Sequence, residues 1–373
     1  MAVNTEGALK KTALHPIHLE LGARMGPFGG YDMPIQYEGI IKEHMACREK
    51  AALFDTCHMG EFLASGPQSE SVIEKLVSCD VSTIAIGQCR YGLLCNEKGG
   101  VIDDLIVYRM EQQKFLIVVN AGTQDNDFAW FSQHAVPGVK FENISAGTHK
   151  IDLQGPASPA IMEKLAGKSI RDLRYYHFAM NTYRDQKVLV SRTGYTGEIG
   201  FEIYLHDEQL TRDFWKQAMS LGAVSAGLGC RDTLRLEMGM PLYGHEMDES
   251  RNAAESGFTR AISTTKDFNG SSAVRAGGSS KLSPIYIEGR SAARNGDRIK
   301  DEAGNDAGVV TSGSFSPSLG HAIALGYVRK DAAGKGSKVR IQTARQELAG
   351  IIGEAPFYRN ATARKPLADF LGT

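Results

Sequence analysis

Two adjacent carboxylates stand inside an otherwise apolar run that reads Gly99-Gly-Val-Ile-Asp-Asp-Leu-Ile-Val-Tyr108. The β-branched and apolar residues of this run predict a strand, in which neighbouring side chains point to opposite faces. If the strand is buried on either side, Asp103 and Asp104 cannot both face solvent. Because a buried ionised carboxylate is costly, one of them needs a hydrogen-bonded neighbour or a cationic, proton-donating ligand. The alternative is that both acids lie at the open end of a hairpin, just after the turn at residues 96–100.

The bulk composition limits the classes of partner. The chain has 373 residues, more than one hydrophobic core usually holds, so two or three domains are expected. Its 42 lysines and arginines nearly balance 43 aspartates and glutamates, so no global field attracts nucleic acid or an anionic membrane. No apolar run approaches the roughly 18 residues of a spanning helix, and the N-terminal residues lack the pattern of a secretory signal. We therefore expect a cytoplasmic protein with neither nucleic acid nor membrane as a partner.

The six cysteines form no Cys-x-x-Cys pair and have no companion histidine at zinc-finger spacing. Neither a metal site nor a redox dithiol is expected from them. We interpret them as reduced thiols in the core or on the surface.

Helical and extended patterns alternate over residues 1–275, and this mixture predicts an α+β fold. Strand-like runs at 91–95, 101–108 and 115–120 predict a β-meander. Helices are expected at 40–52, 72–77, 123–134, 158–165, 208–221 and 230–239, and further strands at 150–153, 187–192 and 200–204.

The composition turns to Gly, Ser, Ala and Lys between residues 267 and 283, which is typical of a linker. The chain beyond it shows short strands split by Gly, Pro, Asn and Ser, and no convincing helix. A small β-barrel or sandwich is therefore expected. Its strands are predicted at 285–288, 307–311, 322–328, 338–341 and 347–352.

A glycine-rich turn precedes an acidic strand residue in Arg192-Thr-Gly-Tyr-Thr-Gly-Glu-Ile-Gly-Phe-Glu-Ile203. Glycines let the backbone approach a flat ligand closely. Glu202 can make two parallel hydrogen bonds with a planar edge, such as that of an arginine or of the amino-pyrimidinone of a pterin or guanine. The alternative is a hairpin whose glutamate pairs with a structural arginine.

A second cluster, Gly229-Cys-Arg-Asp-Thr-Leu-Arg-Leu-Glu237, opens a predicted helix. Arg231 lies in its first turn, where exposed amides favour anions, so it could bind a substrate carboxylate. The alternative is an ion pair with Asp232 or a neighbouring acid.

Some side chains are candidates for stacking on a flat ring, although residues of this kind are more often ordinary core. They are Met59, Tyr91, Tyr195 and Tyr243. His58 is interpreted as a histidine with satisfied hydrogen bonds rather than as a base.

Eight motifs follow one another along the chain: Leu53-Phe-Asp-Thr-Cys-His-Met-Gly60, Gly99 to Tyr108 as above, Leu153-Gln-Gly-Pro156, Thr193-Gly-Tyr-Thr-Gly-Glu198, Gly229 to Glu237 as above, Leu242-Tyr-Gly-His-Glu-Met-Asp-Glu249, Val310-Thr-Ser-Gly-Ser-Phe-Ser-Pro317 and Ala324-Leu-Gly-Tyr-Val328. In this order and spacing they closely resemble the aminomethyltransferase family of the glycine cleavage system, the T proteins. Each motif alone is weak, but together they are highly specific, and the match spans nearly the whole chain.

The resemblance implies a three-lobed, cloverleaf-like fold. Two interleaved α+β lobes in residues 1–275 and a C-terminal β-barrel in residues 276–373 would surround a tetrahydrofolate site. It also implies that a lipoylated H protein delivers an aminomethyl group on sulfur. The one-carbon unit then passes to tetrahydrofolate, the co-substrate, and the products are 5,10-methylenetetrahydrofolate, ammonia and dihydrolipoyl H protein. No metal is implied.

Carried over position by position, the catalytic aspartate of the family falls on Asp104. The resemblance implies that this carboxylate orients the attacking amine and stabilises the cationic species formed as the carbon–sulfur bond breaks. Asp103, on the opposite strand face, is expected to be more tolerant of substitution. The residues implied to contact folate are Glu202 at the pterin edge, Asn120, Arg231, Tyr195, Met59, Tyr91 and Val118.

Three segments depart from the family pattern, namely Thr56-Cys57-His58, Phe258-Thr-Arg260 and residues 356–360. Two alternatives stay open. One is a sister demethylase that takes a methyl or methylene unit from a small donor. The other is a non-catalytic folate-binding factor, although the turn at 192–198 lacks the cysteine of that class. We expect the H protein to dock on scattered basic residues, with Arg260, Arg290 and Arg294 as candidates.

Overall fold

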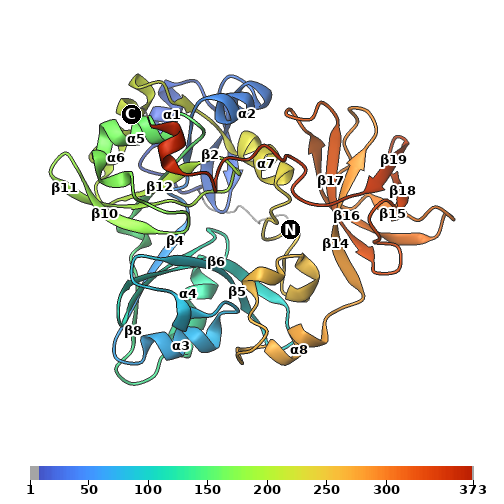
Figure 1. The fold of residues 1–373 in the computed structure, drawn as a ribbon, viewed down its shortest axis with the longest axis horizontal. Helices are drawn as coiled ribbons and strands as arrows, with labels where there is room; N and C mark the ends of the chain where they lie inside the picture. Colours follow the sequence, from blue (N-terminus) through green and yellow to red (C-terminus); the bar gives the residue numbers. More distant parts are fainter. Residues whose placement is uncertain (1–7, 372–373) are drawn as a thin grey trace.

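The computed structural model describes residues 8–371 and shows three lobes around a common centre (Figure 1). Two lobes are built on open sheets of six and five strands, and the third is a closed six-stranded barrel. No helix within the described range is long and apolar enough to cross a membrane.

The first lobe is built on the six-stranded sheet, with helices on its outer face. Its elements are β3 (Ala52–Asp55), β9 (His149–Gln154), β10 (Phe178–Tyr183), β11 (Gln186–Ser191), β12 (Gly200–Leu205), β13 (Val224–Ser225), α5 (Ser158–Ala166) and α6 (Glu208–Ser220). The strand order is β10-β11-β12-β9-β3-β13, and only β13 runs parallel to its neighbour. The Asp207 carboxylate caps α6 by accepting from the Leu210 amide. The apolar side of this helix, including Phe214 and Trp215, packs into the core of the lobe.

The second lobe repeats this plan with the five-stranded sheet. Its elements are β4 (Gly60–Ser65), β5 (Cys89–Cys95), β6 (Val101–Glu111), β7 (Lys114–Val119), β8 (Lys140–Asn143), α3 (Ser69–Leu76) and α4 (Gln124–Gln133). The strand order is β5-β6-β7-β4-β8. Phe62, Leu105 and Ile117 form a core with Phe131 of α4 on the helix side.

The two lobes are interleaved in sequence and packed against each other. The chain leaves the first sheet after β3, builds the entire second sheet, and returns to the first at β9. Tyr108 and Val118 of the second sheet pack with Phe178, Leu189 and Tyr204 of the first. The phenol oxygens of Tyr108 and Tyr204 are 3.0 Å apart. The faces that carry no helices therefore meet in the middle of the molecule.

The N-terminal region and one later helix border these sheets. They comprise α1 (His15–Glu20), the hairpin of β1 (Arg24–Phe28) and β2 (Tyr31–Gln36), α2 (Ile40–Glu49) and α7 (Leu228–Glu237). Helix α7 contacts α2, β2 and the barrel strands β16 and β17, so it lies where the first lobe meets the barrel.

The third lobe is the barrel, preceded by α8 (Ser271–Ala276). Its strands are β14 (Ser280–Ile287), β15 (Arg298–Lys300), β16 (Asp306–Phe315), β17 (Ala322–Arg329), β18 (Lys338–Gln342) and β19 (Glu347–Ile352). The order β14-β17-β16-β15-β18-β19 closes on itself. Ile285, Val310 and Ile341 lie in its core.

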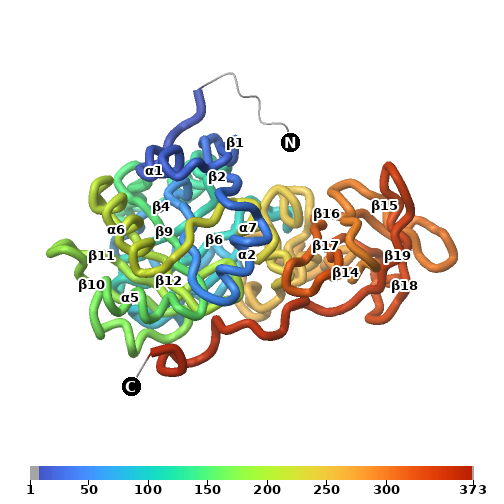
Figure 2. The backbone as a smooth tube through the Cα atoms, turned by 90° about the horizontal axis from the view of Figure 1, so that it is seen from above, coloured from blue at the N-terminus to red at the C-terminus, as the bar shows by residue number. Residues whose placement is uncertain are grey.

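The last described residues leave the barrel and return to the first lobe, as both views show (Figures 1 and 2). The amides of Thr362 and Ala363 donate to the Gly197 carbonyl at 3.1 and 3.0 Å. Leu367 then enters the core of the first lobe. This C-terminal segment ties the glycine-rich turn to the rest of the fold.

The predicted α+β architecture with a C-terminal barrel is confirmed. The meander and the predicted helices lie within a few residues of their expected positions. The expected linker at 267–283 differs, because it contains α8 and the start of β14. Phe268 and Val274 anchor this segment in a core with Met247. The Gly- and Ser-rich composition gave no indication of this packing. All six cysteines are free and buried, so none is a surface thiol.

Candidate active site

Asp103 and Asp104 point to opposite faces of the five-stranded sheet, as strand alternation predicts. Asp103 is fully buried and lies opposite Leu94, which belongs to the core under the helices. Asp104 is partly buried and shares its face with Ile106, which packs toward the first lobe. Asp104 is therefore the acid that faces the space between the lobes. The alternative of a solvent-exposed hairpin mouth is excluded.

One amide joins the two acids. Asn120 directly follows β7, and its Nδ2 donates to Oδ1 of Asp103 and to Oδ1 of Asp104, each at 2.8 Å. The backbone amide of Asn120 also donates to Oδ2 of Asp103 at 2.9 Å. The Asn120 side chain thus holds the two carboxylates in a fixed relation.

The surroundings of Asp104 change its acidity. Burial raises the pKa of Asp104 to about 7, and the charge of Asp103 acts in the same direction. Hydrogen bonds from Asn120 and from the Tyr91 hydroxyl oppose this rise. A carboxyl group with such a pKa can exchange a proton near neutral pH.

Two aromatic residues lie near Asp104. The Tyr91 ring packs at 5.6 Å, centroid to centroid, on Phe258. Burial raises the pKa of Tyr195, and nearby carboxylates, Asp104 among them, act in the same direction. The Tyr195 hydroxyl donates to the Pro241 carbonyl. Both rings are partly buried.

Glu202 presents its carboxylate from the facing sheet. Its Oε1 accepts from Lys150 Nζ at 2.8 Å, and its Oε2 accepts from Thr193 Oγ1 at 2.6 Å and from the Tyr108 hydroxyl at 3.2 Å. Lys150 Nζ also lies 3.3 Å from Met59 Sδ. The sequence alternative in which Glu202 pairs with a structural arginine is wrong, because its cationic partner is a lysine.

Arg231 pairs with a neighbouring acid, as its alternative interpretation held. Its Nη1 donates to Oδ2 of Asp152 at 2.6 Å, whereas Asp232 bonds Arg235. The Arg231 guanidinium also lies 5.1 Å from the centre of the Tyr195 ring. Arg231 therefore links Asp152 of β9 to Tyr195 of the glycine-rich turn.

Two buried groups near Lys150 have no hydrogen-bond partner among the described residues: both carboxyl oxygens of Glu61 and Nδ1 of His58. Burial raises the pKa of Glu61 well above its usual value and lowers that of His58 to about 4. The interpretation of His58 as a satisfied histidine is thus wrong for one ring nitrogen. Glu61 lies opposite Val118, on the face that meets the first lobe.

Sequence reasoning missed Lys150, Asp152 and Glu61. A signal was present, because Lys150, Asp152 and Gln154 alternate with apolar residues along a predicted strand. Such a pattern indicates one polar face, and that face lies in the interior here. All three side chains of this strand face are buried.

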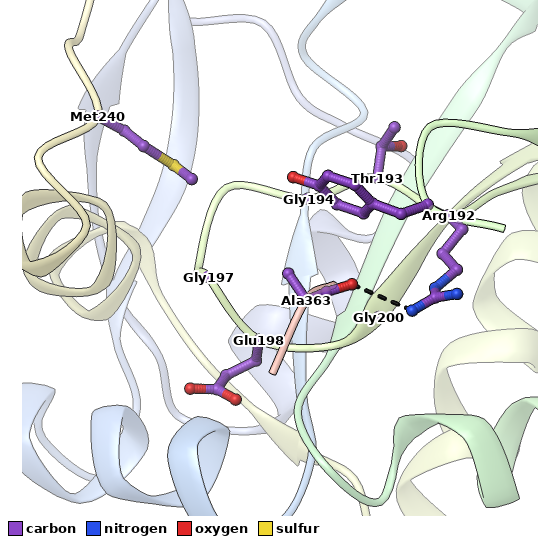
Figure 3. Close-up of a pocket in the computed structure, with 9 residues that line it drawn as sticks. Arg192, Thr193, Gly194, Gly197, Glu198, Gly200, Met240 and Ala363 are labelled. Carbon is purple, nitrogen blue, oxygen red and sulfur yellow. Dashed lines mark hydrogen bonds between the residues drawn. The ribbon is translucent and has the colours of Figure 1, made fainter. Parts of the chain in front are cut away.

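The glycine-rich turn also borders a small cavity on the side of the C-terminal segment (Figure 3). Its volume of about 10 Å³ is that of about one water molecule. Arg192 donates there to the Ala363 carbonyl at 3.1 Å. This gap is too small for a pterin. Among the described residues that line it, Thr193 hydrogen-bonds Glu202. In residues 8–371, no three His, Cys, Asp or Glu side chains are grouped so that they could hold a metal ion.

Comparison with known proteins gives matches over both parts of the chain. Residues 14–266 match the GCVT N-terminal domain, and residues 281–359 match the glycine cleavage T-protein C-terminal barrel domain. An aminomethyltransferase of Halothermothrix orenii is 41% identical, covering 94% of this chain and 100% of that protein. An aminomethyltransferase of Desulforamulus reducens is 39% identical, covering 94% of this chain and 98% of that protein.

A solved structure shows the same fold. The crystal structure of glycine cleavage system aminomethyltransferase T from Bartonella henselae is 31% identical, with a TM-score of 0.89. It covers 96% of this chain and 100% of that one. The fold and these matches define an enzyme of the aminomethyltransferase class. The chain belongs to the glycine cleavage T-protein family, and the predicted function, an aminomethyltransferase of the glycine cleavage system, is confirmed.

Proposed function

We propose that the space between the two sheets binds tetrahydrofolate and that the one-carbon unit is transferred beside Asp104. One observation supports this most directly. The two facing sheets carry Asp104, Asn120 and Tyr91 on one side and Glu202 on the other, next to the apolar contact between the two lobes. A few convergent polar groups in an apolar setting are typical of a small-molecule site.

Glu202 suits the pterin edge. Each oxygen of a carboxylate has two lone pairs. Thr193 and Tyr108 donate to Oε2 and Lys150 donates to Oε1, so these bonds leave an acceptor position on Oε1 of Glu202. The ammonium of Lys150 compensates the buried negative charge and fixes its position. An N–H group of an amino-pyrimidinone would take the remaining acceptor position on Oε1.

Asp104 suits the reacting centre. In the reaction the carbon–sulfur bond breaks with its electron pair going to sulfur, the amine nitrogen leaves as ammonia, and the carbon becomes bonded to two folate nitrogens. Asn120 and Tyr91 fix the Asp104 carboxyl group, so its negative charge is already oriented toward the nitrogen where positive charge develops. With a pKa near neutrality, it can also hold a proton transiently.

The aminomethyl donor is proposed to be the lipoyl arm of a separate H protein. The candidate docking residues Arg260, Arg290 and Arg294 are all exposed. The Arg290 guanidinium lies 4.1 Å from the centre of the Phe315 ring, which fixes its place on the barrel surface.

The test is a turnover assay on the purified protein in three parallel reactions: with aminomethylated H protein, with a free N-methylated amino acid, and without a donor. We expect folate-dependent ammonia release with the H protein and little with the free donor. Equal use of the free donor would favour the demethylase alternative. Folate binding without any turnover would favour the binding factor.

A further inference from the structure

Asp127 of α4 is a buried acid that the proposed transfer step does not use. It is fully buried, and neither carboxyl oxygen meets a donor if every acid is taken as ionised. It nevertheless lies in hydrogen-bond contact with Asp103, the acid on the helix side of β6. Two carboxylates in contact, without a cation between them, repel strongly unless they share a proton.

The shared proton belongs on Asp127. Asp103 already accepts two hydrogen bonds from Asn120, which favour its ionised form. The Thr123 hydroxyl lies near Asp127 and opposes a rise of its pKa, but this hydroxyl also donates to the Asn120 carbonyl at 3.1 Å. Burial together with the charge of Asp103 outweighs it and raises the pKa of Asp127 far above the usual range. A protonated Asp127 gains a donor for Asp103, so one proton removes both the repulsion and the unpaired polar atoms.

We infer that Asp127 is a positioning residue that acts through Asp103 and Asn120 on Asp104. Protonated Asp127 donates to Asp103, Asp103 accepts from both nitrogens of Asn120, and Asn120 Nδ2 holds Oδ1 of Asp104 at 2.8 Å. The Thr123 hydroxyl also donates to the Asn120 carbonyl at 3.1 Å. Helix α4 therefore sets the orientation of an acid on the far face of the sheet. This inference rests on the role proposed for Asp104.

Asp103 consequently has a function that strand alternation alone does not suggest. We replace the expectation that it tolerates substitution, because its carboxylate fixes Asn120 and its charge acts on Asp104. The titratable groups that face this pair come from several elements. They are Tyr91 of β5, Tyr195 of the glycine-rich turn, Asp127 of α4 and Tyr243.

The test compares Asp127→Asn with Asp127→Leu. The asparagine amide still donates to Asp103, so kcat should stay within about threefold of wild type. Leucine has the same branched skeleton, although it is larger, and no donor, so kcat should fall about 10- to 100-fold while KM for tetrahydrofolate changes little, the scale of a misplaced reacting group. A merely structural role would lower stability and raise KM without this split. The inference would be overturned if the kcat of Asp127→Leu equalled that of wild type, or if Asp127→Asn and Asp127→Leu lost kcat equally.

Asp103→Asn keeps the test decisive if the leucine variant does not fold. Removal of the Asp103 charge should lower the pKa of Asp104, so the acid limb of the kcat profile should move to lower pH by about one unit. An unmoved limb would contradict the inference. A failure of the proposed function gives a different result from a failure of this inference. If Asp104 is not at the reacting centre, Asp104→Asn keeps its activity, whatever the Asp127 variants do.

Discussion

The ammonium of Lys150 lies 2.8 Å from Oε1 of Glu202, and both side chains are buried between the two sheets. Removal of Glu202 leaves the Lys150 ammonium with Asp152, 3.4 Å away, as its carboxylate partner, and the loss of a close counter-charge is costly in the interior. Lys150 belongs to β9 and Glu202 to β12, so the register of these two strands determines the pairing. This ion pair defines the first-lobe side of the proposed folate site.

We predict that Glu202→Ala weakens tetrahydrofolate binding by about 2–5 kcal/mol, because it removes the acceptor for the pterin and leaves Lys150 with the more distant Asp152, at 3.4 Å, as its carboxylate partner. Isothermal titration calorimetry measures the dissociation constant. Glu208→Ala, on the exposed side of α6, is the matched control and should bind folate as wild type does. An unchanged dissociation constant for folded Glu202→Ala would refute the assignment of Glu202 to the pterin edge.

Salt should weaken the use of H protein more than the binding of folate. Exposed ion pairs are individually weak and are screened at ionic strengths above about 0.1 M. We therefore expect KM for aminomethylated H protein to rise with salt, and the triple change of Arg260, Arg290 and Arg294 to alanine to reproduce the rise at low salt. Arg345→Ala, in the exposed turn between β18 and β19, serves as the control. Activity that does not respond to salt speaks against electrostatic docking.

Asp55 gives a stability prediction with a definite pH dependence. Burial opposes its ionised form, but hydrogen bonds from His18, Thr12 and the Cys57 amide outweigh burial and lower its pKa to about 2. A folded-state pKa below the usual 3.8 stabilises the fold above that value, and the benefit is lost as pH falls toward 2. The size of this shift corresponds to about 2 kcal/mol.

Asp55→Asn should therefore lower the free energy of unfolding by about 2 kcal/mol at pH 7. Urea denaturation monitored by circular dichroism measures this difference. The gap between variant and wild type should narrow steadily between pH 4 and pH 2. A gap that stays constant over this range would show that the carboxylate charge is not its source.

Features that depend on local pattern could be predicted from the sequence. The opposite orientations of Asp103 and Asp104 follow from strand alternation, and the structure places Asn120 beside both acids because β7 is the next strand of the meander. The hairpin of β1 and β2 was missed, although the pair Gly29-Gly30 at its turn was a usable signal. Both glycines adopt positive φ angles, +55° and +84°.

Features that depend on long-range register could not be predicted in this way. The contact of Lys150 with Glu202 requires β9 to lie beside β12, although about fifty residues separate them in the chain. The pairing of Arg231 with Asp152 likewise joins α7 to β9. The return of the C-terminal segment to Gly197 follows no local pattern. The sequence alternation at residues 150–154 indicated a polar face, but not that this face is buried.

Single-turnover kinetics of Asp104→Asn test the central claim most directly. The enzyme, saturated with tetrahydrofolate, is mixed with aminomethylated H protein, and 5,10-methylenetetrahydrofolate is quantified over time alongside the folate dissociation constant. The account predicts folate affinity close to wild type and a transfer rate at least about 10²-fold lower, because a preorganised charge at the reacting centre is lost. A transfer rate close to wild type in the folded variant would contradict the placement of the reaction at Asp104.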